Sequence, residues 1–197
     1  GRSCSRKFWL LSAISKFGTI AANGFAGNSF RASASYRSRS NRTRTEILIE
    51  NLTADALTDL LRESTRLFLP GTTGEPLALR NRLEGHEDSL AHLSVLTNFV
   101  AGLNDFAHPV LTGAMESAGF FPASEIPAYR QIIATYSGIG RQLAQFAPDI
   151  TFVPTTIPDA RGYVGCGLSA EFVRDALETS GRVVALANPA LPRLING

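Results

Sequence analysis

Short apolar stretches alternate with amphipathic helical stretches over most of the chain, and this alternation constrains the fold more than any other feature of the sequence. The apolar stretches predict strands at 66–70, 92–100, 131–136, 149–153 and 182–187. The last of these is apolar throughout after its first residue, as expected for a strand that is covered on both faces. Parallel strands need a crossover between them, usually a helix. The alternation therefore predicts an α/β fold with an open, mostly parallel sheet and flanking helices.

Apolar residues at helical spacing fill the gaps between these strands. Each of the four predicted helices has an opening residue and an apolar face: Thr53 before Leu57, Leu60 and Leu61; Pro76 before Leu77, Leu79 and Leu83; Ser137 before Ile139, Leu143 and Phe146; and Ser169 before Phe172, Val173, Ala176 and Leu177. A proline suits the first helical turn because its missing N–H is not needed there. Gly181 predicts the end of the last helix. Residues 101–129 are rich in Gly, Pro and Phe and give no clear pattern.

The charged residues divide the chain at Glu46. Residues 1–45 hold nine of the 19 basic residues and no acid, whereas residues 46–197 hold the other ten, all Arg, and all 17 acids. The net charge of +2 therefore combines +9 before the boundary with −7 after it. We interpret 1–45 as a Ser- and Arg-rich leader without folded structure, and 46–197 as one α/β domain.

Three interpretations of residues 1–45 stay open: an organelle transit peptide, a basic arm that binds nucleic acid, and a poorly ordered or non-native upstream extension. The expected location is the cytoplasm, or the mitochondrion if the segment is a transit peptide. The first residue is Gly1 and the only methionine is Met115. We therefore expect the chain to be a fragment or a processed form.

The composition argues against several classes of function. The apolar-rich part of the chain is acidic, so we expect no nucleic-acid partner. No apolar run approaches the roughly 18 residues that span a bilayer, so we expect no membrane partner. The two cysteines, Cys4 and Cys166, form neither a zinc pattern nor a disulfide framework. The three histidines, His86, His92 and His108, lack the spacing of metal ligands, so we expect no metal site.

A glycine loop between a predicted strand and a predicted helix is the best candidate for chemistry. Residues 71–74 read Gly-Thr-Thr-Gly, and Glu75 with Pro76 opens the next helix. Backbone N–H groups at a helix N-terminus attract phosphate or carboxylate, and glycine allows a close approach. The loop lacks the Lys and Ser/Thr of a P-loop, and it is not a G-x-G-x-x-G motif. From the residues alone it is either an anion-binding loop or a tight turn.

Three stretches carry motifs that can be compared with a known family. Residues 70–76 read P-G-T-T-G-E-P, residues 154–169 read P-T-T-I-P-D-A-R-G-Y-V-G-C-G-L-S, and residues 187–193 read A-N-P-A-L-P-R. They resemble the G-x-x-G-E-P, S-P-P-D-x-x-G-Y-x-S-L-G-x-S and V-N-P-x-M-P-R stretches of the acetyl-CoA hydrolase/CoA-transferase family, which includes 4-hydroxybutyrate CoA-transferases. The order and spacing of the three stretches agree with the family over roughly residues 50–197.

The resemblance implies a two-domain enzyme with related α/β halves, of which this chain looks like the N-terminal half. In the family a Glu carboxylate attacks the acyl-CoA, a glutamyl-CoA thioester forms, and a carboxylate or water completes the turnover. That Glu and the main CoA-binding elements belong to the C-terminal half. The resemblance therefore implies that the catalytic residue lies beyond residue 197 and that this fragment alone is inactive.

The resemblance also implies that the glycine loop faces the acyl group. The candidate contacts are Gly71, Thr72, Thr73, Gly74 and Glu75. No cofactor is expected to be permanently bound, because the coenzyme A thioester is a substrate. The expected partners are an acyl-CoA, a small carboxylate, the missing C-terminal domain and, as one option, a second copy in a homodimer. Glu75 is explained equally well as an acid at the start of a helix, where negative charge is favourable.

One alternative function stays open. A stand-alone α/β ligand-binding domain, or a domain like those of sugar-phosphate isomerases, could have the same sheet architecture.

Overall fold

The computed structural model describes most of the chain from residue 54 onward, together with two strands that precede it. The described residues are 31–35, 44–49, 54–123, 126, 129–158, 164–166 and 171–192.

One sheet runs through the described part of the molecule, in the order β1-β2-β8-β7-β3-β4-β5-β6. The strands are β1 (Arg31–Ser35), β2 (Arg44–Ile49), β3 (Arg66–Leu69), β4 (Ser94–Thr97), β5 (Glu116–Gly119), β6 (Tyr129–Gln131), β7 (Ile150–Thr155) and β8 (Arg182–Ala187). β1 pairs antiparallel with β2, and every other neighbouring pair in the sheet is parallel. The predicted open, mostly parallel α/β sheet is confirmed.

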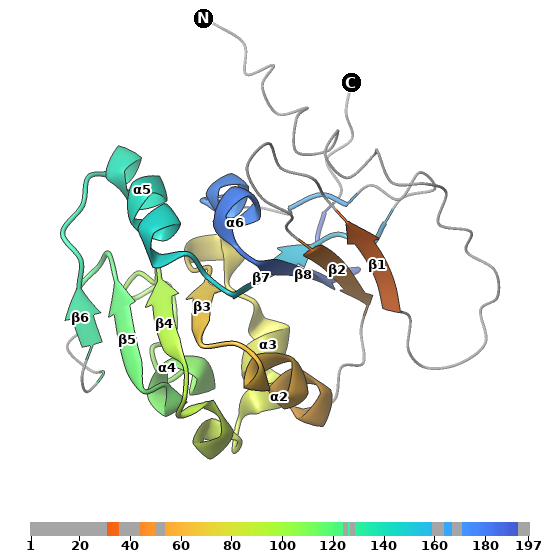
Figure 1. Cartoon of the computed structure of the whole chain (residues 1–197), viewed down its shortest axis with the longest axis horizontal. Helices are drawn as coiled ribbons and strands as arrows, with labels where there is room; N and C mark the ends of the chain where they lie inside the picture. The colour runs from red at the N-terminus through yellow and green to blue at the C-terminus, as the bar shows by residue number, and fades with distance from the viewer. Residues whose placement is uncertain are drawn as a thin grey trace, which may run out of the picture.

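Helices cover both faces of this sheet, as Figure 1 shows. They are α2 (Ala54–Arg62), α3 (Leu77–Leu83), α4 (Pro109–Gly113), α5 (Tyr136–Phe146) and α6 (Val173–Thr179), and two short 3-10 turns are η2 (Thr72–Gly74) and η3 (Glu87–Leu90). α2, α3 and α4 lie on one face, and α5 and α6 lie side by side on the other. This is the expected result when crossovers run in two directions from a central strand.

The side chains of β3 show how the two faces are filled. Leu67 and Leu69 point into a core shared with Leu57, Leu61, Leu79, Leu83 and Val110 of α2, α3 and α4. Phe68 points the other way, into a core shared with Ile139, Leu143 and Ala176 of α5 and α6. Each fully buried leucine or phenylalanine contributes about 1.5–3 kcal/mol by leaving water. The unbroken apolar run of the strand thus reflects its position between two layers of helices.

Four of the five predicted strands are present, but the prediction for 131–136 was wrong. β6 ends at Gln131, and Tyr136 is the first residue of α5. Ile132 donates one more backbone hydrogen bond to Gly119, at 2.7 Å, and the chain then leaves the sheet, so that Ile133 is 93% exposed. The β-branched pair of isoleucines suggested a strand, but the neighbouring strand β5 ends at Gly119 and offers no further partner.

The region 101–129, which gave no pattern, contains α4, β5 and the first residue of β6. α4 has only five residues, and β5 reads Glu-Ser-Ala-Gly, so neither element is long or apolar enough to show a period.

In α3 the predicted apolar face is narrower than expected. Leu79 and Leu83 are buried, but Leu77 is 56% exposed.

Two strands lie at or before the charge boundary. β1 falls within the segment 1–45, and β2 spans Glu46, where its Cα partner on β8 is Val184. The predicted helix caps Thr53 and Ser169 lie outside the described residues. Of the last predicted helix, the structure describes α6, which begins at Val173, directly after Phe172. In the part of the chain that the structure describes, no helix is long and apolar enough to cross a membrane.

Candidate functional site

The described parts of the three motif stretches come together at one edge of the sheet. Residues 70–76 follow β3, residues 156–158 and 164–166 follow β7, and residues 188–192 follow β8. Because these strands are parallel and adjacent in the order β8-β7-β3, their carboxyl ends meet at the same edge. Asn188 donates its N–H to the carbonyl of Thr155 at 2.7 Å, which joins two of the stretches directly.

This edge also contains the topological switch point of the parallel sheet. From β3 the chain proceeds to β4, β5 and β6 on one side, and then returns to β7 on the other side of β3. The connections therefore leave β3 and β7 on opposite faces of the sheet, through α3 on one face and α6 on the other. Ligands of open α/β sheets bind at such a point, at the carboxyl ends of the strands.

The glycine loop is packed directly against the backbone that follows β4. A Cβ added to Gly71 would lie 2.6 Å from the carbonyl oxygen of Asn98, so only glycine fits without a backbone shift. The N–H of Gly71 donates to Oδ1 of Asn98 at 2.6 Å. Gly74 closes the short turn η2 by donating its N–H to the carbonyl of Gly71 at 2.9 Å. The loop is therefore built into the sheet edge rather than standing free of it.

Thr72 holds an unusual backbone conformation in the middle of this loop. Its φ is +52°, in the left-handed region that a β-branched residue rarely occupies. Such a conformation costs about 1–3 kcal/mol and persists only where the surroundings fix it. Asn104 fixes both sides of the residue: its Oδ1 accepts from the Thr72 N–H at 2.8 Å, and its Nδ2 donates to the Thr72 carbonyl at 2.9 Å.

Glu75 ends the loop and has one satisfied and one unsatisfied carboxylate oxygen. Asn104 donates Nδ2 to Oε2 at 2.8 Å, whereas Oε1 is buried and has no hydrogen-bond partner among the described residues. Burial raises the pKa of Glu75 above 4.5; the Asn104 hydrogen bond and the charge of Arg80 oppose this increase, and Asp105 adds to it. A carboxyl group with a raised pKa and a free oxygen in a loop at a switch point is a candidate ligand contact.

Glu171 brings a second carboxylate to the same loop. Its Oε2 accepts from Oγ1 of Thr72 at 2.9 Å and from Nδ2 of Asn98 at 3.4 Å. Tyr136, at the start of α5, also interacts with Glu171. Desolvation, the negative charge of Glu171 and a hydrogen bond with that carboxylate all raise the pKa of Tyr136.

The structure thus brings the five predicted loop residues together with Asn98, Asn104 and Glu171, none of which was predicted. Asn98 carried a usable signal, because it is the first polar residue after the buried end of β4 and such positions lie at the ligand-binding edge. Asn104 and Glu171 carried none, since they are 32 and 99 positions from Thr72 in the sequence. Thr73 is exposed and makes no hydrogen bond within the described residues.

Two other groups singled out by residue type are buried and have perturbed pKa values. His108 is fully buried; desolvation and the charge of Arg80, opposed by Asp105, lower its pKa to about 3. Its Nδ1 accepts from the N–H of Val110 at 3.2 Å, which caps α4. Burial raises the pKa of Cys166 to about 11, so its thiol is protonated at neutral pH. Among the described residues, no cluster of three or more His, Cys, Asp or Glu side chains could hold a metal ion.

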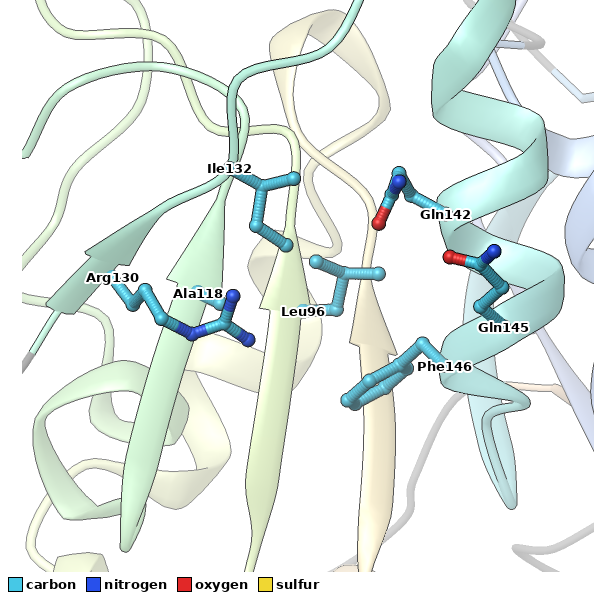
Figure 2. Close-up of a pocket in the computed structure, with 7 residues that line it drawn as sticks. All are labelled: Leu96, Ala118, Arg130, Ile132, Gln142, Gln145 and Phe146. Atoms are coloured by element: carbon cyan, nitrogen blue, oxygen red, sulfur yellow. The ribbon is translucent and has the colours of Figure 1, made fainter.

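A separate hollow lies on the sheet face beside α5, as Figure 2 shows. Its volume is about 200 Å³, and its lining comes from β4, β5, β6, the residue that follows β6, and α5: Leu96, Ala118, Arg130, Ile132, Gln142, Gln145 and Phe146. None of these residues belongs to the glycine loop or to the hydrogen bonds around it.

Known structures share this architecture. RipA from Yersinia pestis superposes with a TM-score of 0.60 at 14% identity, over 73% of this chain and 37% of its own length. A 4-hydroxybutyrate CoA-transferase from Porphyromonas gingivalis superposes with a TM-score of 0.54 at 18% identity, over 76% of this chain and 35% of its own length. No protein-family model and no curated protein sequence matches the chain. The predicted resemblance to CoA-transferases is thus confirmed in the fold, and the chain spans little more than a third of the length of these structures.

Proposed function

We propose that this chain supplies the N-terminal, acyl-facing wall of a CoA-transferase or acyl-CoA hydrolase. The full enzyme would move CoA from an acyl-CoA to a carboxylate or to water through a glutamyl-CoA thioester, with the nucleophilic Glu beyond residue 197. The observation that carries the proposal is the convergence of the described parts of the three motif stretches on the carboxyl ends of β8, β7 and β3, at the switch point of the sheet. The shared fold with a 4-hydroxybutyrate CoA-transferase agrees with it.

The glycine loop is the part of this wall that we assign to the acyl group. Gly71 lets the backbone pass against Asn98, and η2 leaves Thr73 exposed. Around the loop the described residues provide amides, hydroxyls and two carboxylates, Glu75 and Glu171. Arg80, the cation whose charge acts on Glu75, is paired with Asp105 at 2.6 Å. Such a wall suits an uncharged acyl chain better than the polyanionic CoA moiety, which we assign to the other half of the enzyme.

Carboxylate and water would compete for the same thioester, so transferase and hydrolase are two outcomes of one mechanism. The wall described here contributes to that mechanism by orienting the acyl group and by limiting the access of water.

The test is NMR titration of the ¹⁵N-labelled chain with a short-chain acyl-CoA and, separately, with free CoA. We expect the amide signals of residues 71–75 to shift at millimolar acyl-CoA and to stay in place with free CoA. Gly71→Ala should abolish the shifts, because its Cβ displaces the loop from Asn98. Gly138→Ala in α5 is the matched control, since its Cβ would meet only the side chains of Thr135 and Ala134.

A second measurement tests the position of the nucleophile. The chain is incubated with acyl-CoA and acetate, and any glutamyl thioester is trapped with borohydride and located by mass spectrometry. We expect neither transfer nor trapping within residues 46–197. A labelled glutamate in that range, or an unshifted glycine loop in the titration, would contradict the proposal.

A further inference from the structure

The carboxylate of Glu171 joins connections that leave three neighbouring strands. Thr72 follows β3, Asn98 follows β4, and Glu171 lies in the connection from β7 to α6. One oxygen of Glu171, Oε2, accepts from the Thr72 hydroxyl at 2.9 Å and from the Asn98 amide at 3.4 Å. Since β7, β3 and β4 are adjacent in the sheet, this side chain closes the edge across the switch point.

The backbone on both sides of this contact is in the left-handed region. The φ of Thr72 is +52° and that of Phe172, which follows Glu171, is +54°. Among the described non-glycine residues, the third positive φ belongs to Ala147, where a helix C-cap explains it. The two conformations at the switch point have no such local explanation, so contacts from other parts of the chain must fix them.

The surroundings of Glu171 fix the connection to α6 as well. The ring of Phe172 packs against the ring of Tyr136, with centroids 5.1 Å apart. Phe172 is buried in the core that lies between the sheet and the helices α5 and α6. The carboxylate is thus anchored on the side of α6 and presents its oxygen to a loop whose own residues, 71–75, contribute few apolar contacts.

We propose that Glu171 is a positioning residue of the glycine loop: Asn104 holds the backbone of Thr72, and the carboxylate of Glu171 holds the Thr72 hydroxyl and thereby fixes the loop at the carboxyl edge of the sheet. The loop then offers Thr73 and Glu75 to the acyl group in one conformation. The identity of that ligand rests on the proposed function, whereas the positioning is a property of the free protein and can be measured without any ligand.

The test is amide hydrogen exchange by NMR on the full chain, read at Gly71, Thr72 and Gly74. In Glu171→Ala we expect exchange at these amides to be about five- to tenfold faster, since one hydrogen bond that orders the loop is lost. Glu171→Gln should restore most of the protection, because its side-chain oxygen can accept the same two bonds. Glu178→Ala is the matched control on α6; Glu178 pairs with Arg174 at the surface, and its loss should leave the loop unchanged.

Protection of core amides in β3 and β8 shows whether each variant is folded. Should Glu171→Ala fail to fold, Thr72→Val gives the same test, because it removes only the hydroxyl and keeps the β-branched shape. Thr72→Ser, which keeps the hydroxyl, is its control. Unchanged exchange in Glu171→Ala or Thr72→Val would overturn the proposal. So would equal loss of protection in Glu171→Gln and Glu171→Ala, because the glutamine retains the acceptor.

An acyl-CoA titration of the same variants separates this inference from the proposed function. We expect weaker acyl-CoA binding in Glu171→Ala than in Glu171→Gln. If the loop exchanges as expected but no variant, including the wild type, binds acyl-CoA, the proposed function fails and the positioning role of Glu171 stands.

Discussion

The two ends of the sheet use carboxylates in opposite ways. At the amino ends of the strands, Asp149 accepts four hydrogen bonds, from N–H and Oγ1 of Thr65 and from N–H and Nη2 of Arg66, at 2.8–3.0 Å. Burial alone would raise its pKa, but these bonds outweigh that effect and lower it to about 2. At the carboxyl ends, Glu75 has a raised pKa and a buried oxygen without a partner among the described residues.

This difference separates a structural acid from a candidate functional one. Asp149 is satisfied, and it joins the start of β3 to the start of β7. Glu75 is held on one side only: Asn104 donates to Oε2, and the buried Oε1 has no hydrogen-bond partner among the described residues. A group with a shifted pKa and a missing hydrogen-bond partner lowers the stability of the fold. Such groups concentrate at functional sites, where this cost is tolerated.

Among the variants that test this difference between the two ends of the sheet, Asn104→Ala is expected to lose the most free energy of unfolding. Its side chain makes four hydrogen bonds, with N–H and carbonyl of Thr72, with N–H of Val100 and with Glu75. Removing it leaves several partly buried groups without partners, so we expect a loss of about 3 kcal/mol in the free energy of unfolding, measured by urea denaturation. Asn188→Ala, at an exposed asparagine whose side chain accepts one local hydrogen bond, should lose less than about 1 kcal/mol. Equal losses in the two variants would show that the network around the loop is energetically unimportant.

Asp149→Asn is expected to lose less free energy of unfolding, and the size of this loss should depend on pH. The folded pKa of Asp149 is below its ordinary value of 3.8, so its ionised form stabilises the fold above pH 4, and this contribution disappears as the pH falls toward 2. The side chain is 34% exposed, so after allowance for solvent screening we expect a loss of about 1–2 kcal/mol at pH 7. Unfolding free energies at pH 7 and pH 3 test this, with the exposed Asp59→Asn as the control. A loss that is as large at pH 3 as at pH 7 would rule out the carboxylate as its source.

Glu75→Gln is expected to change the free energy of unfolding least, and at pH 7 to raise it rather than lower it. Because the folded pKa is raised above 4.5, this carboxyl favours folding only when protonated, and that contribution is lost as the pH rises through the folded pKa. At pH 7 the glutamine variant should be as stable as the wild type or more stable by less than about 1 kcal/mol, with no gain near pH 4. A ¹³C titration of the Glu75 carboxyl should give a pKa above 4.5. A clear destabilisation at pH 7 would place Glu75 with Asp149 as a structural acid.

The sequence predicted the layers of this fold better than the contacts of its site. The buried strands β3 and β8 are apolar runs after their first residue, and β7 is largely apolar; all three were found, because burial on both faces affects composition directly. The glycine loop was found because its glycines stand between a strand and a proline. Asn104 and Glu171 were not, since each acts on Thr72 across a distance in sequence that only the folded sheet brings together.

The switch point also determines when the site can exist during folding. β4 joins β3 over a separation of 28 residues, from Leu69 to Thr97, whereas the contact of Arg66 with Asp149 closes 83 residues. The longer closure costs more chain entropy and is expected to form later. A partly folded chain that has assembled only β3 to β6 would therefore contain the glycine loop without Glu171. We expect the contact between Glu171 and the glycine loop to be the last part of this edge to assemble and among the first to open when the native chain fluctuates.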